Sequence, residues 1–316
     1  MKNAVCKLLL CALLLPALAA ANDEDASSFS FGIIAKPLNA RQDDAALKEA
    51  LAESDADNLA FVVVNGIKAG DEPCSDALYQ ERKALFDSAK NGLVVSVAAS
   101  DWATCTEGKR SVAFEQINRL RDMFFNGDYS FGDSKIILAR QSAMPKFRNY
   151  AENMRWRIGK VVFATLNLPA NDNNYTNAAG RNSEYEDREI ANSDWLERLF
   201  ITAKVNRLHA IVLFCDGDPM IRGEHGLFFS SERRRKGFAD IRRKILAGAA
   251  GFKGKILIVH NDDAARHATA GKDIIWHGNI GTLHIDGPWR KVNVDTSRAA
   301  PFSLASQAIP MQARSQ

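Results

Sequence analysis

Residues 60–76 read AFVVVNGIKAGDEPCSD, and residues 94–105 read VVSVAASDWATC. Each stretch is an apolar run rich in valine, followed by a loop of small and polar residues. An apolar run without alternation is typical of a strand that is buried on both faces of a parallel sheet. We therefore expect the two loops at the carboxyl edge of an α/β sheet, where ligand sites of such folds usually lie.

The rest of the chain repeats strands and helices and then becomes richer in strands. In the first half we expect strands over 31–35, 59–64 and 93–97, and helices over 43–52, 76–90 and 112–125. In the second half we expect a hairpin over 155–168, a helix over 190–206, strands over 210–214 and 256–259, and short strands between 274 and 295. The pattern predicts an α/β protein with a two-sheet β-sandwich flanked by helices.

The first 21 residues have the features of a secretory signal peptide. Lys2 and Lys7 precede an apolar run, and small residues follow it. The run is too short to span a membrane, and no later run is long enough. A lipoprotein anchored through Cys11 is the weaker alternative, because bulky leucines precede that cysteine. We predict a signal peptide over 1–21, one domain over 22–295, a loosely ordered tail over 296–316, and a periplasmic or secreted location.

The charge balance argues against nucleic acid as a partner. The chain has 41 basic and 38 acidic residues, and removal of Lys2 and Lys7 with the signal peptide leaves 39 basic residues. A nearly neutral protein lacks the basic surface that nucleic-acid binding requires. The expected partner is a small molecule or another protein. The basic segment 232–244 is either an anion-binding patch or, more commonly, the solvated face of a helix.

Two short motifs carry a resemblance to a known family. Residues 67–76 fit Ile-Lys-x-Gly-x-x-Pro-Cys-Ser-Asp, and residues 102–105 fit Trp-x-x-Cys. The layout resembles an exported bacterial branch of the calcineurin-like metallophosphoesterases. The resemblance implies a four-layer fold, in which two sheets lie between helical layers. In that family two divalent metal ions, bridged by one carboxylate, generate hydroxide and bind the phosphoryl oxygens.

The same resemblance bears on the cysteines. The branch carries cysteines at the positions of Cys74 and Cys105, which lie in loops after neighbouring strands. A disulfide between them is the natural pairing in an oxidising compartment, and unpaired thiols are the alternative. Cys215 follows an apolar strand and is expected to be a buried thiol.

The metal ligands of the family are largely missing from this chain. The family's first aspartate falls on Lys36, and its bridging aspartate falls on Gly66, which has no ligand atom. Its asparagine ligand falls on Ser100 with Asp101 as the surviving acid, and its second late histidine falls on Ala264. Loss of the bridging carboxylate alone is expected to remove a normal dinuclear site.

The lysine at the first ligand position has two alternative roles. A positive side chain there repels a divalent ion by Coulomb interaction. Lys36 either occupies the vacated metal position or points to solvent.

Polar residues also follow two later strands. Asp216 and Asp218 follow the strand over 210–214, and His260 and Asp262 follow the strand over 256–259. If these side chains converge, they supply oxygen and imidazole ligands for a single Mn, Zn or Ca ion. The alternative is that they are turn and capping residues.

Two hypotheses about function follow. The first is an exported protein with a phosphoesterase-like fold that has lost dinuclear catalysis, acts in binding or scaffolding, and needs no cofactor. The alternative is an active phosphoesterase with a rearranged mononuclear site and one divalent ion, in which Asp101 and His260 are the catalytic candidates. Three independent ligand losses favour the first hypothesis.

Overall fold

The computed structural model describes residues 26–35, 44–176, 182–220, 236–262, 273–285 and 288–305. The helices are α1 (Asp44–Asp55), α2 (Asp76–Asp87), α3 (Ala113–Phe124), α4 (Ser183–Val205) and α5 (Ala239–Ala250). The strands are β1 (Ser28–Ala35), β2 (Val62–Asn65), β3 (Leu93–Ser96), β4 (Thr106–Glu107), β5 (Arg110–Ser111), β6 (Ala139–Arg140), β7 (Met154–Ile158), β8 (Val161–Thr165), β9 (Ala210–Phe214), β10 (Lys255–His260), β11 (Ile275–His277), β12 (Ile280–His284), β13 (Arg290–Asp295) and β14 (Phe302–Leu304).

Two sheets face each other and form the predicted sandwich. One has the strand order β14-β13-β1-β2-β3, and the other has the order β11-β12-β10-β9-β8-β7-β6. The apolar runs of the first half pair in parallel as β1, β2 and β3. In the second sheet β8, β9, β10 and β12 are parallel, and the predicted hairpin forms β7 and β8. Parallel pairing brings the carboxyl ends of these strands to one edge of each sheet.

Alternation along the buried strands divides the core into two parts. In β8, Val161 and Phe163 face the other sheet, whereas Val162 and Ala164 face the helices on the outside. Between the sheets, the ring centroids of Phe61 and Phe163 are 4.8 Å apart, and those of Trp156 and Phe163 are 5.6 Å apart. Such aromatic pairs add about 0.5–1.5 kcal/mol each beyond the burial of their area.

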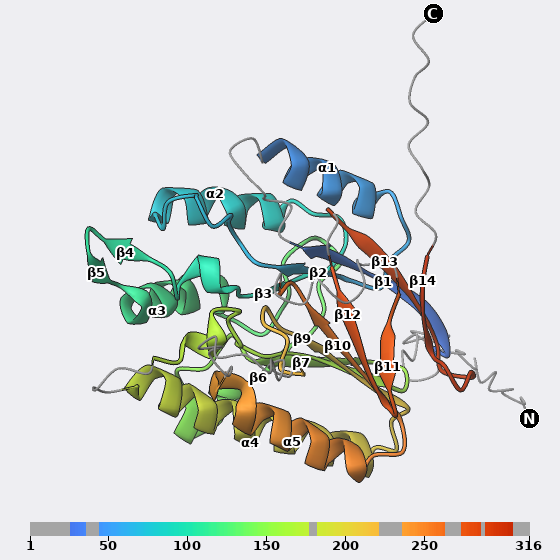
Figure 1. Ribbon diagram of the computed structural model, residues 1–316. Helices are drawn as coiled ribbons and strands as arrows, with labels where there is room; N and C mark the ends of the chain where they lie inside the picture. Colours follow the sequence, from blue (N-terminus) through green and yellow to red (C-terminus); the bar gives the residue numbers. More distant parts are fainter. Residues whose placement is uncertain are drawn as a thin grey trace, which may run out of the picture.

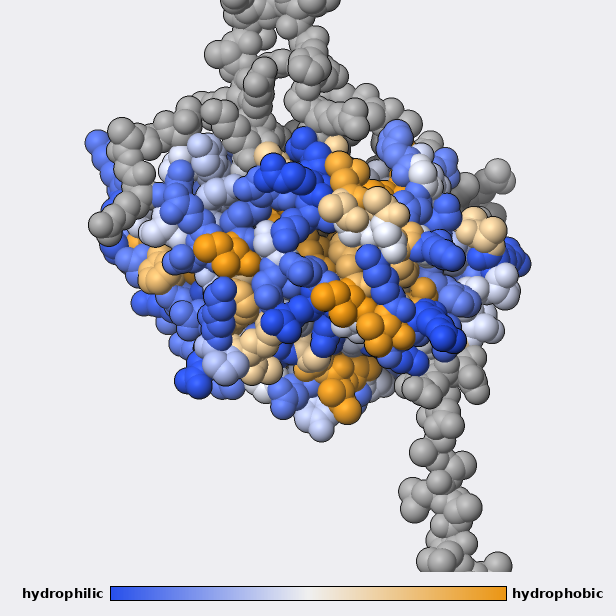
Figure 2. Space-filling view, turned by 90° about the horizontal axis from the view of Figure 1, so that it is seen from below, coloured by the Kyte–Doolittle hydropathy of each residue, from blue (hydrophilic) through white to orange (hydrophobic). Residues whose placement is uncertain are grey.

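Helices cover both outer faces of the sandwich, which gives the four-layer α/β arrangement (Figure 1). Helices α1 and α2 lie over the five-stranded sheet, and α4 and α5 lie over the seven-stranded sheet. The outer face of α4 and α5 is seen in Figure 2, where hydrophobic residues lie among hydrophilic ones. The exposed large apolar residues of these two helices are Ile190, Ile201, Val205 and Leu246.

Two of the differences from the sequence-based expectation have a clear physical reason. Helix α4 begins at Ser183 rather than at 190, because the buried Arg188 bonds to the Glu184 carboxylate at 2.7 Å and to the Asn173 carbonyl at 2.8 Å. The expected loose tail is wrong for Phe302–Leu304, which forms β14 against β13 and buries Phe302. The predicted signal peptide lies outside the described residues. Within the described ranges, no helix is long and apolar enough to cross a membrane.

Candidate functional site

The carboxyl edges of the two sheets are joined by buried amide side chains. Asn65, the last residue of β2, donates a hydrogen bond from Nδ2 to the carbonyl oxygen of Cys215 after β9, at 2.7 Å. Asn261, directly after β10, donates from Nδ2 to the carbonyl oxygen of Asn65, also at 2.7 Å. All three residues are buried. The loops that the sequence predicted to carry chemistry therefore meet at one place and link the two sheets.

Asp101, a predicted catalytic candidate, is fully buried after β3. Its Oδ1 accepts hydrogen bonds from the backbone N–H groups of Ile67 at 2.9 Å and Lys68 at 3.1 Å. Its Oδ2 accepts from the N–H of Ala98 at 2.7 Å. Burial raises the pKa of Asp101 to about 6, while the three N–H groups and the Lys68 charge oppose the rise. Both carboxylate oxygens therefore bind the backbone of the two loops.

Asp216, a predicted metal ligand, is also fully buried. Its Oδ2 accepts hydrogen bonds from the N–H of Ala99 at 2.7 Å and the N–H of Ala170 at 2.9 Å. Ala99 follows β3 in one sheet, whereas Ala170 follows β8 in the other. The carboxylate therefore connects loops from both sheets.

Three of the predicted metal candidates lie together. Nε2 of His260 is 3.8 Å from Oδ2 of Asp218, and the N–H of Asp262 donates to Nδ1 of His260 at 3.3 Å. The N–H of Asp218 in turn donates to Oδ2 of Asp262 at 3.3 Å. Burial lowers the pKa of His260, although Asp218 opposes the fall. A neutral His260 that accepts at Nδ1 carries its proton on Nε2, toward Asp218.

These contacts do not by themselves form a metal centre. Within the described residues, no group of three His, Cys, Asp or Glu side chains has the geometry to hold a metal ion. Three buried amide oxygens are nevertheless without a hydrogen-bond partner in that part of the chain, namely Oδ1 of Asn65, Asn167 and Asn261. A buried acceptor without a partner is costly, and amide oxygens are ligands for hard cations. The mononuclear site stays a prediction.

Two of the four positions at which the resemblance predicts lost metal ligands lie within the described residues. Gly66 has a φ of 105°, a conformation that favours glycine, and its N–H donates to the carbonyl oxygen of Ser96 at 2.8 Å. Ser100 is buried, and its hydroxyl donates to the carbonyl oxygen of Lys68 at 3.2 Å. Lys36 and Ala264 lie outside the described residues. Neither Gly66 nor Ser100 offers a carboxylate, and the loss of a dinuclear metal site stays a prediction.

A disulfide joins the loop after β2 to the loop after β3. Cys74 and Cys105 are bonded, with their Cα atoms 6.0 Å apart, as the resemblance implied. Cys215 is the buried unpaired thiol that was expected, and burial raises its pKa.

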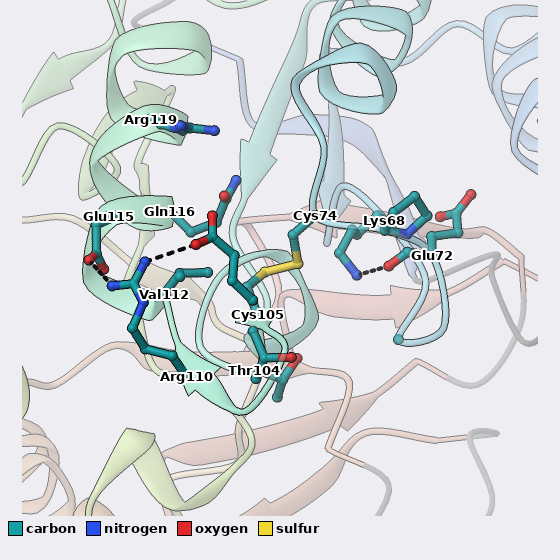
Figure 3. Close-up of a pocket in the computed structure, with 14 residues that line it drawn as sticks. Lys68, Glu72, Cys74, Thr104, Cys105, Arg110, Val112, Glu115, Gln116 and Arg119 are labelled. Carbon is teal, nitrogen blue, oxygen red and sulfur yellow. Dashed lines mark hydrogen bonds and ion pairs between the residues drawn. A yellow bond between two sulfur atoms is a disulfide. The ribbon is translucent and has the colours of Figure 1, made fainter.

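Beside the disulfide lies a pocket of about 510 Å³ (Figure 3). It is bounded by the loop after β2, by residues 104–112, and by the first half of α3. Its charged side chains are paired within the protein. Arg110 bonds to Glu107 and Glu115, both at 2.9 Å, and Arg119 bonds to Asp76 at 3.2 Å.

The charged residues in the loop after β2, which forms one wall of this pocket, are also paired within the protein. Lys68 is buried and donates from Nζ to the carbonyl oxygens of Ala69 at 2.7 Å and Glu72 at 2.8 Å. The Glu72 carboxylate accepts from the N–H of Ala69 and from Arg82, both at 2.7 Å. The pocket therefore has a polar wall whose charges are neutralised by the protein.

Sequence reasoning did not select Asn65 or Asn261 as site residues. A signal was present, because Asn65 directly follows the apolar run over 61–64 and Asn261 lies one residue beyond the apolar run over 256–259, and a buried amide requires hydrogen-bond partners. Sequence reasoning also did not select the pocket beside the disulfide. The residues of that pocket come from three separate segments, and only the fold brings them together.

Comparison with known proteins supports the fold. No protein-family model matches the chain, and no curated protein sequence matches it. A solved structure entitled "Structure of PhoD" is similar, with a TM-score of 0.53 at 10% sequence identity. The match covers 86% of this chain and 65% of the PhoD chain, so this chain spans less than two thirds of that length. PhoD is alkaline phosphatase D, with a metallophosphoesterase-like fold. The layers, the sheet order and this likeness together identify an α/β phosphoesterase-like fold.

Proposed function

We propose that this chain is an exported, degenerate relative of the calcineurin-like metallophosphoesterases that binds a partner and does not hydrolyse phosphate esters. The observation that carries the proposal is the environment of Asp101. Both oxygens of this buried carboxylate accept backbone N–H bonds from the loops after β2 and β3. A carboxylate used in this way stabilises the loops and has little capacity left for a metal ion.

The neighbouring positions support the same conclusion. A dinuclear site needs a carboxylate that bridges two metals about 3.5–4 Å apart. Gly66, at the aligned position, has no ligand atom, and its positive φ disfavours a side chain. One carboxylate oxygen of Asp216 accepts hydrogen bonds from two backbone N–H groups. The site chemistry has shifted from metal ligation to hydrogen bonds between the two sheets.

The pocket beside the disulfide is the proposed place for the partner or ligand. Its volume of about 510 Å³ lies within the range of small-molecule sites, about 300–1,000 Å³. Because its charged residues are already paired within the protein, the pocket favours a polar ligand without net charge. The Cys74–Cys105 disulfide holds one wall and agrees with function in an oxidising compartment.

Elemental analysis of the mature protein, together with assays of phosphate monoester and diester hydrolysis, tests the proposal. We expect less than one equivalent of tightly bound metal, and no turnover with added Mn²⁺, Zn²⁺ or Fe²⁺. Two equivalents of Mn, Fe or Zn with metal-dependent turnover would overturn the proposal.

A mononuclear phosphoesterase is the second candidate function. It is favoured by the contact between His260 and Asp218, and by the unpartnered oxygens of Asn65 and Asn261. In that case one equivalent of metal is retained, and both metal and turnover are lost in His260→Ala. The exposed His277→Ala is the matched control and leaves both unchanged.

A further inference from the structure

A second pocket, of about 520 Å³, lies away from the strand ends, at the carboxyl end of α3. Residues 118–128 form one wall, and residues 140–151 form the other. We call it the Arg140 pocket. Its charged lining residues are Arg121, Asp122, Asp128, Arg140 and Arg148.

Arg140 is a buried cation without a carboxylate partner. Its side chain donates from Nε to the carbonyl oxygen of Gly127, and from Nη1 to the carbonyl oxygen of Ala151 at 2.9 Å. Arg140 is 8% exposed, and among the described residues no carboxylate lies within ion-pair distance of it. Burial lowers the pKa of Arg140 to about 10, while the charges of Asp128 and Glu152 oppose the fall. The guanidinium is therefore still positive at neutral pH.

The guanidinium is held in place and keeps an unused donor. The ring of Phe125 lies 5.8 Å below its central carbon, and the two carbonyl bonds fix its plane. Nη2 has no hydrogen-bond partner within the described part of the protein. A buried charge is normally paired, because its transfer out of water is costly. An oriented guanidinium whose Nη2 is unused at the wall of a pocket can donate a charge-assisted hydrogen bond to a carboxylate.

Arg121, which lines the same pocket, differs from Arg140 in that it is paired with a carboxylate. Arg121 binds the fully buried Glu152 through two hydrogen bonds, of 2.6 and 2.9 Å, and donates to Asn118 Oδ1 at 3.0 Å. Its charge is therefore satisfied by the protein. Arg148 is exposed, and no described carboxylate pairs with it. The positive charge left for a ligand comes from Arg140 and Arg148.

The acidic residues of the pocket limit the class of anion. Asp122 and Asp128 are exposed on the wall formed by α3 and the turn after it, and neither forms an ion pair with a described residue. The carboxyl end of α3 adds partial negative charge there. These groups repel a phosphate dianion and attract an ammonium group. We propose that the Arg140 pocket binds a small zwitterionic carboxylate with the functional groups of an α-amino acid.

Calorimetric titration of the full-length mature protein tests this proposal, with the common amino acids added one at a time and orthophosphate as a competing probe. We expect saturable binding of at least one amino acid, and weak or no binding of orthophosphate. The decarboxylated amine of that amino acid should not bind, because it lacks the group that Arg140 recognises.

Substitutions assign the site. Arg140→Gln should weaken binding roughly 10- to 100-fold, as expected for loss of a buried hydrogen bond between charged groups. Arg148→Gln removes an exposed charge, so it should weaken binding about two- to five-fold and leave the melting temperature unchanged. Arg119→Gln, at an exposed arginine of the pocket beside the disulfide, is the matched control and should have no effect.

Each alternative result overturns the proposal. Failure of every amino acid to bind removes the proposed ligand class, and tighter binding of orthophosphate with the same dependence on Arg148 replaces it by a simple oxyanion. Binding that is unchanged in Arg148→Gln and Asp128→Asn would place the ligand elsewhere, even if Arg140→Gln did not fold. A ligand bound in the pocket beside the disulfide would respond to Arg119→Gln instead. The result is therefore independent of the proposed function.

Discussion

Replacement of Asp216 measures how much the strand-end carboxylates stabilise the fold. In Asp216→Ala, the buried N–H of Ala99 and the half-buried N–H of Ala170 lose a charged acceptor. Each hydrogen bond to a charged group contributes about 1.5–3 kcal/mol. Because water can reach the Ala170 N–H, we expect the free energy of unfolding to fall by about 2–4 kcal/mol rather than by the full sum. Asp216→Asn keeps an oxygen for both N–H groups, so its loss should be smaller by about 1 kcal/mol or more.

Denaturant unfolding followed by tryptophan fluorescence gives these differences as shifts in the transition midpoint. Asp133→Ala is the control, because Asp133 is exposed and its side chain makes no described contact. Metal content is measured on the same samples. If Asp216→Ala and Asp216→Asn were both as stable as the wild type while bound metal disappeared, Asp216 would be a ligand and the structural role given to it would be wrong.

Three other perturbations have expected outcomes. Serine at both Cys74 and Cys105 should lower the free energy of unfolding by about 3–4 kcal/mol, from the entropy of a loop closed over a separation of 31 residues, and reduction of the wild type should reproduce the loss. Gly66→Asp and Gly66→Ala should cost a similar amount, about 1–3 kcal/mol, because φ rather than charge is the obstacle; a stable Gly66→Asp protein with bound metal would contradict this. Burial, and then the charge of Asp240, raises the pKa of Glu189 to about 7. The folded protein therefore holds this proton more tightly than the unfolded chain does. The resulting stabilisation is complete below the unfolded pKa near 4.5 and is lost as the pH rises to about 7. Thermal melts between pH 4.5 and 8 should show this loss, about 1–3 kcal/mol, and Glu189→Gln should reduce it; an unchanged pH profile would refute the assignment.

The parts of the fold that the sequence predicted well share one physical property. The strands expected over 59–64 and 93–97 are almost wholly apolar and rich in valine, without polar alternation, and such a run is typical of a strand buried on both faces. The first turns of α4 were missed because they carry no apolar face. They are stabilised by Arg188, whose partners lie in a different part of the chain.

The candidate site was predictable in position but not in role. The sequence placed Asp101 and Asp216 in loops after buried strands, where the structure also has them, but it offered convergence of Asp216, Asp218, His260 and Asp262 only as one of two alternatives. Whether a carboxylate there binds a metal or a backbone N–H depends on distances of a few tenths of an ångström, which the order of residues does not determine. The Arg140 pocket left no local pattern, because Arg140 ends the two-residue strand β6, Arg148 lies in the turns that follow it, and neither stretch is long enough to show a periodicity.

The hydrogen bonds from asparagine side chains that join the two sheets also determine when, during folding, the sheets can dock against each other. Asn65 bonds to Cys215, 150 residues further along the chain, and Asn261 bonds to Asn65 across 196 residues. Contacts of such sequence separation form slowly, since the loop entropy is lost before the bonds form. During synthesis, the apolar strand that ends at Asn65 lacks its contacts with the second sheet until that sheet has left the ribosome. Strands β1, β2 and β3 are therefore the part of this protein most exposed to aggregation while it folds, and a chain that stops before residue 215 cannot form the hydrogen bond between Asn65 and Cys215.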